Sequence, residues 1–367
     1  MNGRTERNSG DPSTTTHKAM LPDEGGAVRV PETQTVCVMI PAYNCEKWLP
    51  RCLRSVIEQT YRDLEVIVID DGSTDGSAII ADDFAKLDPR IRFVSQSNAG
   101  VAAARNRALA MTASPLIMFL DSDDWLDTTA IEKSVDILMR EDCDLVFFGR
   151  ISTSLNEKSV VVHDSYPAFR VFQKGELLSE YLKGNVPVFL WAKLYKRVLF
   201  DGITFPSGRI FEDISVMHKV FAKTGKAAYL PERLHFRMHR PGSLSKTMLS
   251  CKKEKDNLMA FQDCLAFVHE QRHPLEICAR AHVLRSALAV LTHNVMMPCL
   301  SPDEEKAVCA LVRENADAAP LLPKRYRRLC DSVLDKKHYL RLYGFLRFLQ
   351  QALKKHAAGI RLHFAKT

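Results

Sequence analysis

The stretch MFLDSDDW, residues 118–125, changes abruptly from apolar to acidic. Its first half has the character of a buried strand, and three carboxylates, Asp121, Asp123 and Asp124, follow within four positions. Like charges this close together repel one another unless a positive charge lies between them. We therefore expect either a well-solvated acidic turn or a bound cation at this point in the chain.

The sequence on both sides of this stretch alternates between strand and helix patterns. Short apolar runs predict strands at residues 35–40, 64–69, 91–95, 115–120 and 144–148, and helical spacing predicts helices at 46–59, 75–87, 101–111 and 128–140. Continuous apolar strands separated by helices are typical of a parallel sheet that is covered on both faces. We therefore predict an α/β fold, Rossmann-like in layout, with a mostly parallel central sheet flanked by helices.

Polar clusters follow four of the predicted strands: PAYN at 41–44, DDGSTD at 70–75, QSNAGVAAARN at 96–106 and DSDD at 121–124. Ligands of such sheets bind beyond the carboxyl ends of the strands, so one nucleotide site is expected there. The fingerprints GxGxxG and GxxxxGK[ST] are missing, which disfavours a nicotinamide dehydrogenase and a P-loop kinase. Two carboxylates one residue apart can turn toward one hard cation that also binds diphosphate oxygens, which favours the bound cation.

Length and composition suggest how the chain is divided. With 367 residues, 46% hydrophobic and 26% charged, it has the size of one large or two ordinary globular domains. Residues 1–34 are rich in Gly, Ser, Thr, Pro and charge, which predicts a disordered tail. The alternating strands and helices place one α/β domain, which carries the expected nucleotide site, at residues 35–249, and helical patterns predict a C-terminal helical extension at 250–367.

Ten cysteines are spread along the chain without a CxxC pair or a zinc-like spacing. This pattern predicts reduced thiols and an intracellular protein. The N-terminus lacks the apolar core of a signal peptide, and no run of about 18 apolar residues is present to span a membrane. We therefore expect a cytoplasmic protein whose membrane contact is at most peripheral.

Residues 336–367 contain eight Lys or Arg and no Asp or Glu. Apolar residues from Leu342 to Leu353 follow helical spacing, and cations lie on the opposite face, so we predict a basic amphipathic helix. It can pack its apolar stripe on the domain, or it can attach peripherally to anionic lipid at the cytoplasmic face of a membrane. Elsewhere the basic residues are mixed with acidic ones, so no nucleic-acid partner is expected.

The four polar motifs together resemble those of the family 2 glycosyltransferases. They read V-x-V-M-I-P-A-Y-N, V-I-D-D-G-S-T-D, N-A-G-V-A-A-A-R-N and F-L-D-S-D-D-W, in this order, and the resemblance extends over residues 35–245. It implies an A-type nucleotide-diphospho-sugar transferase fold. It also implies inverting transfer of a single sugar, from a nucleotide-diphosphate donor that is normally a UDP-sugar, to a hydroxyl of a glycan or lipid-linked acceptor in cell-surface polysaccharide biosynthesis.

The resemblance assigns nucleotide contacts to six residues of the first three motifs: Pro41, Ala42, Tyr43, Asp71, Asn98 and Arg105. The first three would line the nucleobase and ribose, and the Asp71 carboxylate would accept a hydrogen bond from the base. Asp70 would instead brace the turn. Arg105 would offset diphosphate charge with paired, planar donors. The alternative for Arg105 is a salt bridge on a helix surface.

Asp121 and Asp123 match the family's D-x-D motif. The resemblance implies that Asp123 binds a divalent metal, Mn²⁺ or Mg²⁺, which bridges the two phosphates, and that Asp121 contacts the ribose or the same metal. We interpret Asp124 as the cap of the following helix. In the segment HFRMHRPGSLS, residues 235–245, His239 rather than His235 is the candidate third metal ligand, with a purely structural histidine as the alternative.

The pair Glu212-Asp213 matches the family's E-D pair, which makes Asp213 the candidate catalytic base and Glu212 a residue that positions it or the donor sugar. Without the resemblance, a capped first turn explains these residues, because acidic groups are favoured at helix N-termini. In WAKLYKRVL, residues 191–199, the resemblance lets Trp191 stack on a sugar face and Lys193 face the site. Two other functions stay open: a sugar-1-phosphate nucleotidyltransferase and a non-catalytic nucleotide-sugar-binding module.

Overall fold

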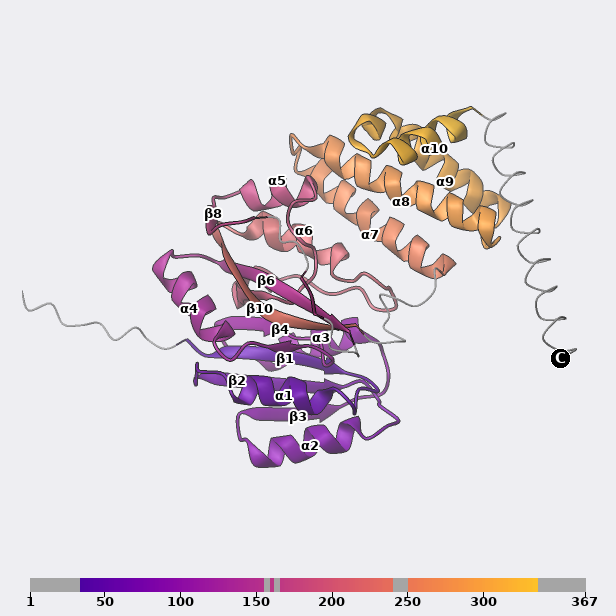
Figure 1. Ribbon diagram of the computed structural model, residues 1–367. Helices are drawn as coiled ribbons and strands as arrows, with labels where there is room; N and C mark the ends of the chain where they lie inside the picture. Colours follow the sequence, from indigo (N-terminus) through magenta and orange to yellow (C-terminus); the bar gives the residue numbers. More distant parts are fainter. Residues whose placement is uncertain (1–33, 155–158, 162–165, 240–249, 336–367) are drawn as a thin grey trace, which may run out of the picture. The chain divides into compact units, whose positions relative to one another are not determined.

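The computed structural model describes residues 34–154, 159–161, 166–239 and 250–335. A ten-stranded sheet lies at its centre (Figure 1), in the order β3-β2-β1-β4-β9-β6-β10-β5, with β7 paired to β6 and β8 to β10. The strands are β1 Val36–Ala42, β2 Leu64–Asp70, β3 Ile91–Ser95, β4 Leu116–Phe119, β5 Trp125–Leu126, β6 Leu145–Ser154, β7 Ser159–Val161, β8 Arg170–Phe172, β9 Lys193–Lys196 and β10 Ala227–His239. The predicted tail at 1–34, apart from its last residue, and the predicted helix within 336–367 lie outside the described residues.

Most of the long strands run in one direction. β1 is parallel to β2 and β4, β2 to β3, and β6 to β10. β9 lies between β4 and β6 and is antiparallel to both, so β6 and β10 keep the direction of β4. The predicted α/β sheet is confirmed, but the insertion of β9 was not predicted. The carboxyl ends of β1, β2 and β4 therefore meet at one edge, as the position of the polar motifs requires.

Helices cover both faces of the sheet because its central strands are apolar on both sides. In β1, Val36, Val38 and Ile40 join one core and Cys37 and Met39 the other, as expected from the alternation of side chains along a strand. The first core is covered by α1 Leu49–Ile57, α2 Ser77–Leu87 and α4 Ala130–Arg140, and the second by α3 Val101–Met111, α5 Glu176–Leu182, the short η1 Arg197–Phe200 and α6 Ile214–Lys223.

The C-terminal part of the described chain is helical, as predicted. It consists of α7 Cys251–Glu270, α8 Glu276–Met296, α9 Pro302–Glu314, η2 Ala316–Leu321 and α10 Lys324–Leu334. These helices enclose a core of their own, in which Phe261 of α7 packs with Leu284 and Leu288 of α8. Cys264 and Val268 of α7 instead join the second core, which contains Cys37 and Met39 of β1. In the described part of the chain, every helix is too short or too polar to cross a bilayer.

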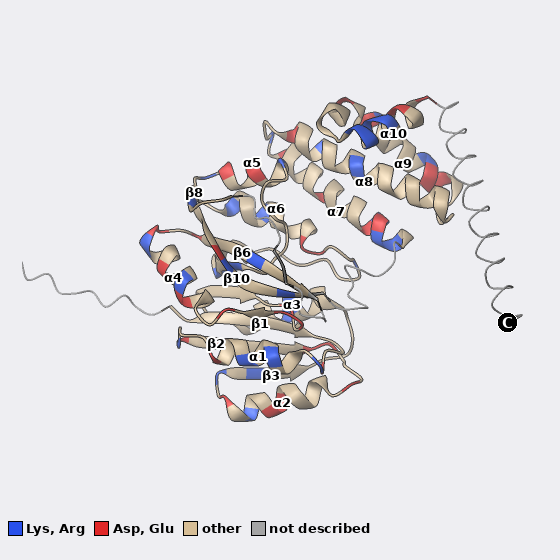
Figure 2. Cartoon of the chain, viewed as in Figure 1, with Lys and Arg blue, Asp and Glu red and all other residues tan. Residues whose placement is uncertain are grey.

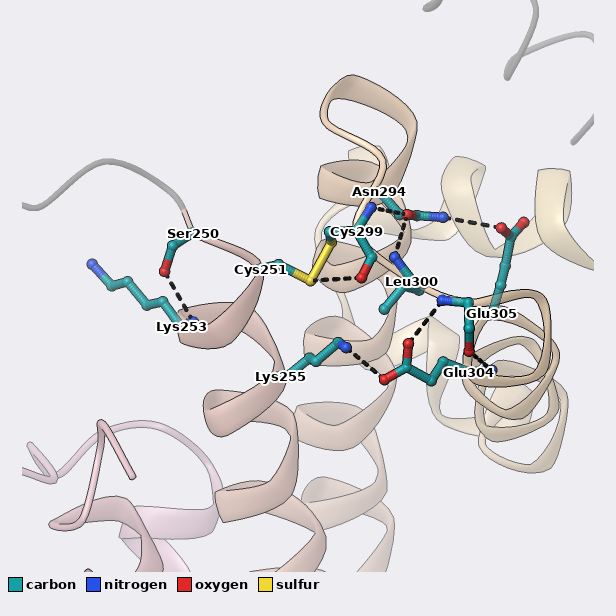
Figure 3. Close-up of a disulfide and its surroundings, with 10 residues drawn as sticks. Ser250, Cys251, Lys253, Lys255, Asn294, Cys299, Leu300, Glu304 and Glu305 are labelled. Carbon is teal, nitrogen blue, oxygen red and sulfur yellow. Dashed lines mark hydrogen bonds and ion pairs between the residues drawn. A yellow bond between two sulfur atoms is a disulfide. The ribbon is translucent and has the colours of Figure 1, made fainter. Parts of the chain in front are cut away.

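A disulfide joins Cys251, the first residue of α7, to Cys299 in the loop between α8 and α9 (Figure 3). The loop is fixed by Asn294, whose Oδ1 accepts hydrogen bonds from the backbone N–H groups of Cys299 at 2.9 Å and Leu300 at 3.0 Å. The prediction of reduced thiols is therefore wrong for this pair, although the other eight cysteines are free. No local sequence pattern marks this pair, because the bonded cysteines are 48 residues apart.

Replacing Cys251 with serine is expected to lower the free energy of unfolding by about 2–4 kcal/mol, because the crosslink restricts the unfolded chain. Guanidinium denaturation of the oxidised native protein and of Cys251→Ser measures the difference. Dithiothreitol should lower the native midpoint to that of the variant and leave the variant unchanged. Cys278→Ser, at a half-buried free thiol, is the matched control. Equal midpoints for oxidised and reduced native protein would contradict the expectation.

Candidate active site

The first two motifs meet where β1 and β2 end. Pro41 and Ala42 are the last residues of β1, and the Tyr43 side chain after them is 46% exposed. Asp70, the last residue of β2, accepts hydrogen bonds from the backbone N–H of Ser73 at 3.2 Å and from the Ser95 hydroxyl at 2.9 Å. The prediction that Asp70 braces the turn is therefore confirmed, and Tyr43 stays available to a ligand.

Asp71 is buried and connects β2 to the loop before α3. Its Oδ1 accepts from Ala99 N at 2.9 Å and from Gln96 Nε2 at 2.8 Å, and its Oδ2 accepts from Gly100 N at 2.7 Å. Gly100 is the N-cap of α3. Asp71 therefore fixes the start of α3, and its contact with a nucleobase stays a prediction. Asn98 in the same loop is exposed, and its role is likewise still a prediction.

Gly72 brings the turn after β2 against this loop. It has a φ of +74°, and a Cβ added to it would lie 2.8 Å from the backbone nitrogen of Asn98. Side chains rarely adopt this conformation, and real Cβ atoms do not approach backbone so closely. Only glycine therefore lets the second and third motifs pack together.

Arg105 of α3 joins the donor-side and acceptor-side motifs. Its guanidinium is buried and donates to Asp121 Oδ1 at 3.0 Å and to Glu212 Oε1. The alternative of a salt bridge on the helix surface is wrong, because the Arg105 side chain is only 6% exposed. Two carboxylates already engage the terminal nitrogens of Arg105. Its contact with a diphosphate stays a prediction. Arg105 thus holds the D-x-D loop and the E-D pair in one place.

Asp213 is the N-cap of α6, and its Oδ1 accepts from the backbone N–H of Ile214 at 2.8 Å. Burial, followed by the neighbouring Glu212 carboxylate, raises the pKa of Asp213 to about 7, while the charge of Arg105 opposes this rise. A carboxyl group poised near neutral pH can accept a proton, and strongly shifted groups of this kind cluster at functional sites. The capped turn and a catalytic role are therefore compatible.

Lys193 and Trp191 lie beside this site but are covered by protein. Burial lowers the pKa of Lys193 well below its ordinary value, and the Asp213 carboxylate opposes this change. Trp191 is 7% exposed and stacks on Phe189, with ring centroids 3.7 Å apart, and on His235 at 4.6 Å. The prediction that Trp191 stacks on a sugar face is therefore wrong for this structure, because other rings already occupy its indole.

The prediction that Asp124 caps the following helix is wrong. It is buried, and its oxygens accept from His235 Nε2 at 2.9 Å and from the backbone N–H of Met238 at 2.8 Å. The helix begins only at Ala130, with Thr129 as its N-cap, because β5 intervenes. Sequence reasoning missed this pairing, since Asp124 and His235 are 111 residues apart.

A divalent metal fits the D-x-D loop only if the donor completes its coordination. Within the described residues no group of three or more His, Cys, Asp or Glu side chains can hold a metal. Asp121 and Asp123 are half-buried carboxylates beyond β4, and one or two carboxylates with substrate phosphates are the usual ligands of Mg²⁺. The backbone of His239 ends β10, but its side chain lies outside the described residues.

Comparison with known proteins identifies the enzyme class. Residues 37–204 match the family described as glycosyl transferase family 2. The chain is 33% identical to Glycosyltransferase GlyA of Streptococcus pneumoniae over 58% of its own length and 31% of GlyA, so it spans about a third of that relative. It is 29% identical to Glycosyltransferase GlyG of the same organism, over 64% of this chain and 81% of GlyG. These matches show a glycosyltransferase and give no support to a nucleotidyltransferase or a non-catalytic module.

Two further matches concern polysaccharide synthesis and the fold. Chondroitin synthase of Escherichia coli is 38% identical over 36% of this chain and 19% of its own. The crystal structure of Staphylococcus aureus TarS 1–349 in complex with UDP-GlcNAc superposes with a TM-score of 0.61 at 16% identity, covering 88% of this chain and 92% of TarS. The TarS likeness shows that the central sheet and its helices form a fold already known in solved structures.

Proposed function

We propose that this glycosyltransferase moves one sugar from a UDP-sugar to a hydroxyl of a glycan or lipid-linked acceptor in cell-surface polysaccharide biosynthesis. The observation that carries the proposal is a continuous set of contacts: Asp71 fixes α3, and Arg105 of α3 joins Asp121 to Glu212, the neighbour of Asp213. The complex of TarS with UDP-GlcNAc and the match to a chondroitin synthase support the donor and the pathway class.

In the proposed reaction Asp213 is the base. Its Oδ1 is engaged by Ile214, so Oδ2 is left to accept the proton of the acceptor hydroxyl. The acceptor oxygen bonds to the anomeric carbon from the face opposite the diphosphate, which leaves with the electrons of the broken C–O bond, so the configuration inverts. Glu212 and Arg105 hold the base beside the donor loop, and no covalent enzyme intermediate is needed.

The donor would lie along the edge formed by Tyr43, Asp71 and Asn98. Pro41 and Ala42 would form the wall behind the base, and Asp121 would contact the ribose. A divalent ion, Mn²⁺ or Mg²⁺, held by Asp123 with Asp121 and the phosphates, would offset negative charge on the diphosphate. In this assignment Asp123 is the main ligand of the ion, as the D-x-D resemblance implies, and Asp121 also accepts from Arg105.

A donor screen tests the proposal. Thermal stability is measured with UDP-, GDP- and dTDP-sugars, with and without Mn²⁺, because a ligand that binds the folded state raises its melting temperature. We expect a metal-dependent rise with a UDP-sugar and none with ATP or NAD. Turnover with that donor, followed by NMR of the anomeric proton of the product, then tests inversion. Retention of configuration would contradict the mechanism, and use of a GDP-sugar would contradict the nucleotide.

Gly72→Ala is expected to weaken the affinity for the nucleotide sugar at least about tenfold, because the new Cβ pushes the third motif away from the second. Isothermal titration with the donor found in the screen measures this affinity. Gly184→Ala is the matched control, since Gly184 has a similar φ of +82° but no neighbour within 4 Å of the added Cβ. Equal affinities of the two variants would contradict the close approach.

We also propose that the enzyme works at the cytoplasmic face of an anionic membrane, through residues 336–367 and the helix before them. Figure 2 shows basic residues gathered on α10. Lys324, Arg325, Arg327 and Arg328 are all exposed there, and residues 318–330 contain no Asp or Glu. Such clusters favour anionic lipid surfaces. Co-sedimentation with phosphatidylglycerol vesicles but not with phosphatidylcholine vesicles is expected, and equal recovery with both would contradict the proposal.

A further inference from the structure

A buried histidine and carboxylate lie behind the candidate active site without a role in the reaction described above. The His235 side chain is 0% exposed and that of Asp124 2% exposed, and Nε2 of His235 lies 2.9 Å from Oδ2 of Asp124. Burial lowers the pKa of His235 to about 3, so its ring is neutral and Nε2 donates the hydrogen bond. The second oxygen of Asp124 accepts from Met238 N. The D-x-D loop is thereby tied to β10.

The other contact of His235 leads toward the base. Its ring stacks on Trp191, with an interplanar angle of 19°, and Trp191 stacks on Phe189 at 9°. The carbonyl of Phe189 accepts from Lys193 Nζ, and the same nitrogen lies 4.3 Å from the centroid of the Phe189 ring. Lys193 interacts electrostatically with Asp213. His235 thus contacts both Asp124 and this stack of Phe189, Trp191 and Lys193.

We propose that Asp124 and His235 are positioning residues. They hold the donor loop, residues 121–124, in a fixed position relative to the stack of Phe189, Trp191 and Lys193. The hydrogen bond of His235 acts on the donor loop, and its ring acts on the stack. The inference rests on the proposed function, because the groups that these two residues position are those of the proposed sugar transfer. Because the His235 ring is neutral, this is a hydrogen bond between buried polar groups. Satisfied groups of this kind fix one arrangement of the surrounding core, which favours a role in placement.

Two substitutions separate the two contacts of His235. His235→Phe keeps a ring that can stack but removes the donor to Asp124, whereas His235→Gln keeps an amide donor but removes the ring. We expect His235→Phe to raise the KM for the nucleotide sugar about tenfold with a smaller change in kcat, and His235→Gln to lower kcat about tenfold with a KM near that of the native enzyme. In the double variant Asp124→Leu/His235→Phe, the rise in KM should be smaller than the product of the two single effects, because the two residues share one hydrogen bond.

His282 provides the matched control in the helical region. Its ring stacks on Phe261 at 4.9 Å, and its Nε2 donates to the carbonyl of Leu182 at 2.8 Å, so it makes the same two kinds of contact as His235. His282→Phe and His282→Gln are expected to lower the melting temperature and to leave KM and kcat unchanged. If the His235 variants behave in the same way, the pair is merely structural and the proposal is overturned.

The outcomes stay distinguishable from those of the proposed function. All kinetic comparisons use the donor that the native enzyme itself accepts in the screen. A native enzyme that uses a GDP-sugar contradicts the UDP assignment, and the variants still decide the positioning role. Should His235→Phe not yield folded protein, His235→Gln decides alone: a loss of kcat at unchanged KM supports the proposal, and native constants overturn it.

Discussion

Asp213→Asn is expected to reduce kcat at least about 10³-fold while the affinity for the nucleotide sugar stays near the native value. The amide has the shape of the carboxyl group and can still accept from Ile214 N, so α6 keeps its cap. It cannot accept the proton of the acceptor hydroxyl. Initial rates of sugar transfer and calorimetric titration with the donor measure the two quantities. Native kcat in Asp213→Asn would withdraw the assignment of the base.

The pH dependence follows from the same residue. Because burial raises the pKa of Asp213 to about 7, native kcat/KM is expected to rise as the pH passes through 7, where the base loses its proton. Glu212→Gln removes the neighbouring carboxylate that contributes to the rise, so the profile of this variant should move to lower pH. A native profile that is flat between pH 5 and 8 would contradict a base with this pKa.

The raised pKa of Asp213 should also make the stability of the folded protein depend on pH. The pKa of Asp213 is higher in the folded chain, at about 7, than the value of about 3.9 of an unfolded aspartate, so the folded state binds the proton more tightly. The stabilising contribution is full below the lower pKa and is lost as the pH rises through 7. Asp213→Asn cannot ionise, so its melting temperature should rise relative to that of the native protein between pH 4 and pH 8. A constant difference would contradict the shift.

The sequence predicted those parts of the fold that depend on local patterns. The strand at 91–95 and the helix at 101–111 have the predicted bounds, because each is a short local pattern with polar or turn residues at both ends. The insertion of β9 between β4 and β6 depends on pairing across the sheet, which periodicity does not record. The motifs at the carboxyl ends of the strands were predictable, since the fold class fixes the edge at which they meet.

The errors at the site share one physical cause. Asp124 and Trp191 were assigned from their neighbours in the sequence or from motif position, whereas both contact His235, which lies far along the chain. The surface salt bridge considered for Arg105 is the same case, because its partner Glu212 is 107 residues away. A charged residue after a strand looks like a helix cap or a solvated turn until its buried partner is known. The disulfide of Cys251 is the same case, because its partner lies beyond a whole helix pair.

Arg105→Gln is expected to have the second large effect, because one guanidinium serves several carboxylates. Its removal leaves Asp121 and Glu212 facing each other without a positive charge, close to Asp213. Breaking a buried ion pair from one side costs about 3–5 kcal/mol of folding free energy. The pKa of Asp213 should rise further, because the positive charge of Arg105 lowers it. The base then stays protonated at neutral pH.

Kinetics and denaturation measure the two consequences separately. At pH 7 we expect kcat/KM to fall by about 10² to 10⁴ and part of the loss to return at pH 9, where Asp213 can ionise again. Arg105→Lys keeps the charge but lacks the planar guanidinium that reaches two carboxylates. Compared with Arg105→Gln, its pH profile should be close to the native one, while its rate of transfer should stay below the native rate. The chemical denaturation midpoint of Arg105→Gln should be lower than that of the native protein.

The neighbouring Arg107 is the control on the same helix. It is exposed and donates to the carbonyl of Ser95 and to Gln96, both at 3.3 Å. Arg107→Gln therefore removes the same charge without touching the two carboxylates that Arg105 holds. If Arg105→Gln behaved like Arg107→Gln, the link between the donor loop and the base would not exist. If Arg105→Gln alone loses activity and recovers it at alkaline pH, the guanidinium tunes the base as well as holding the site together.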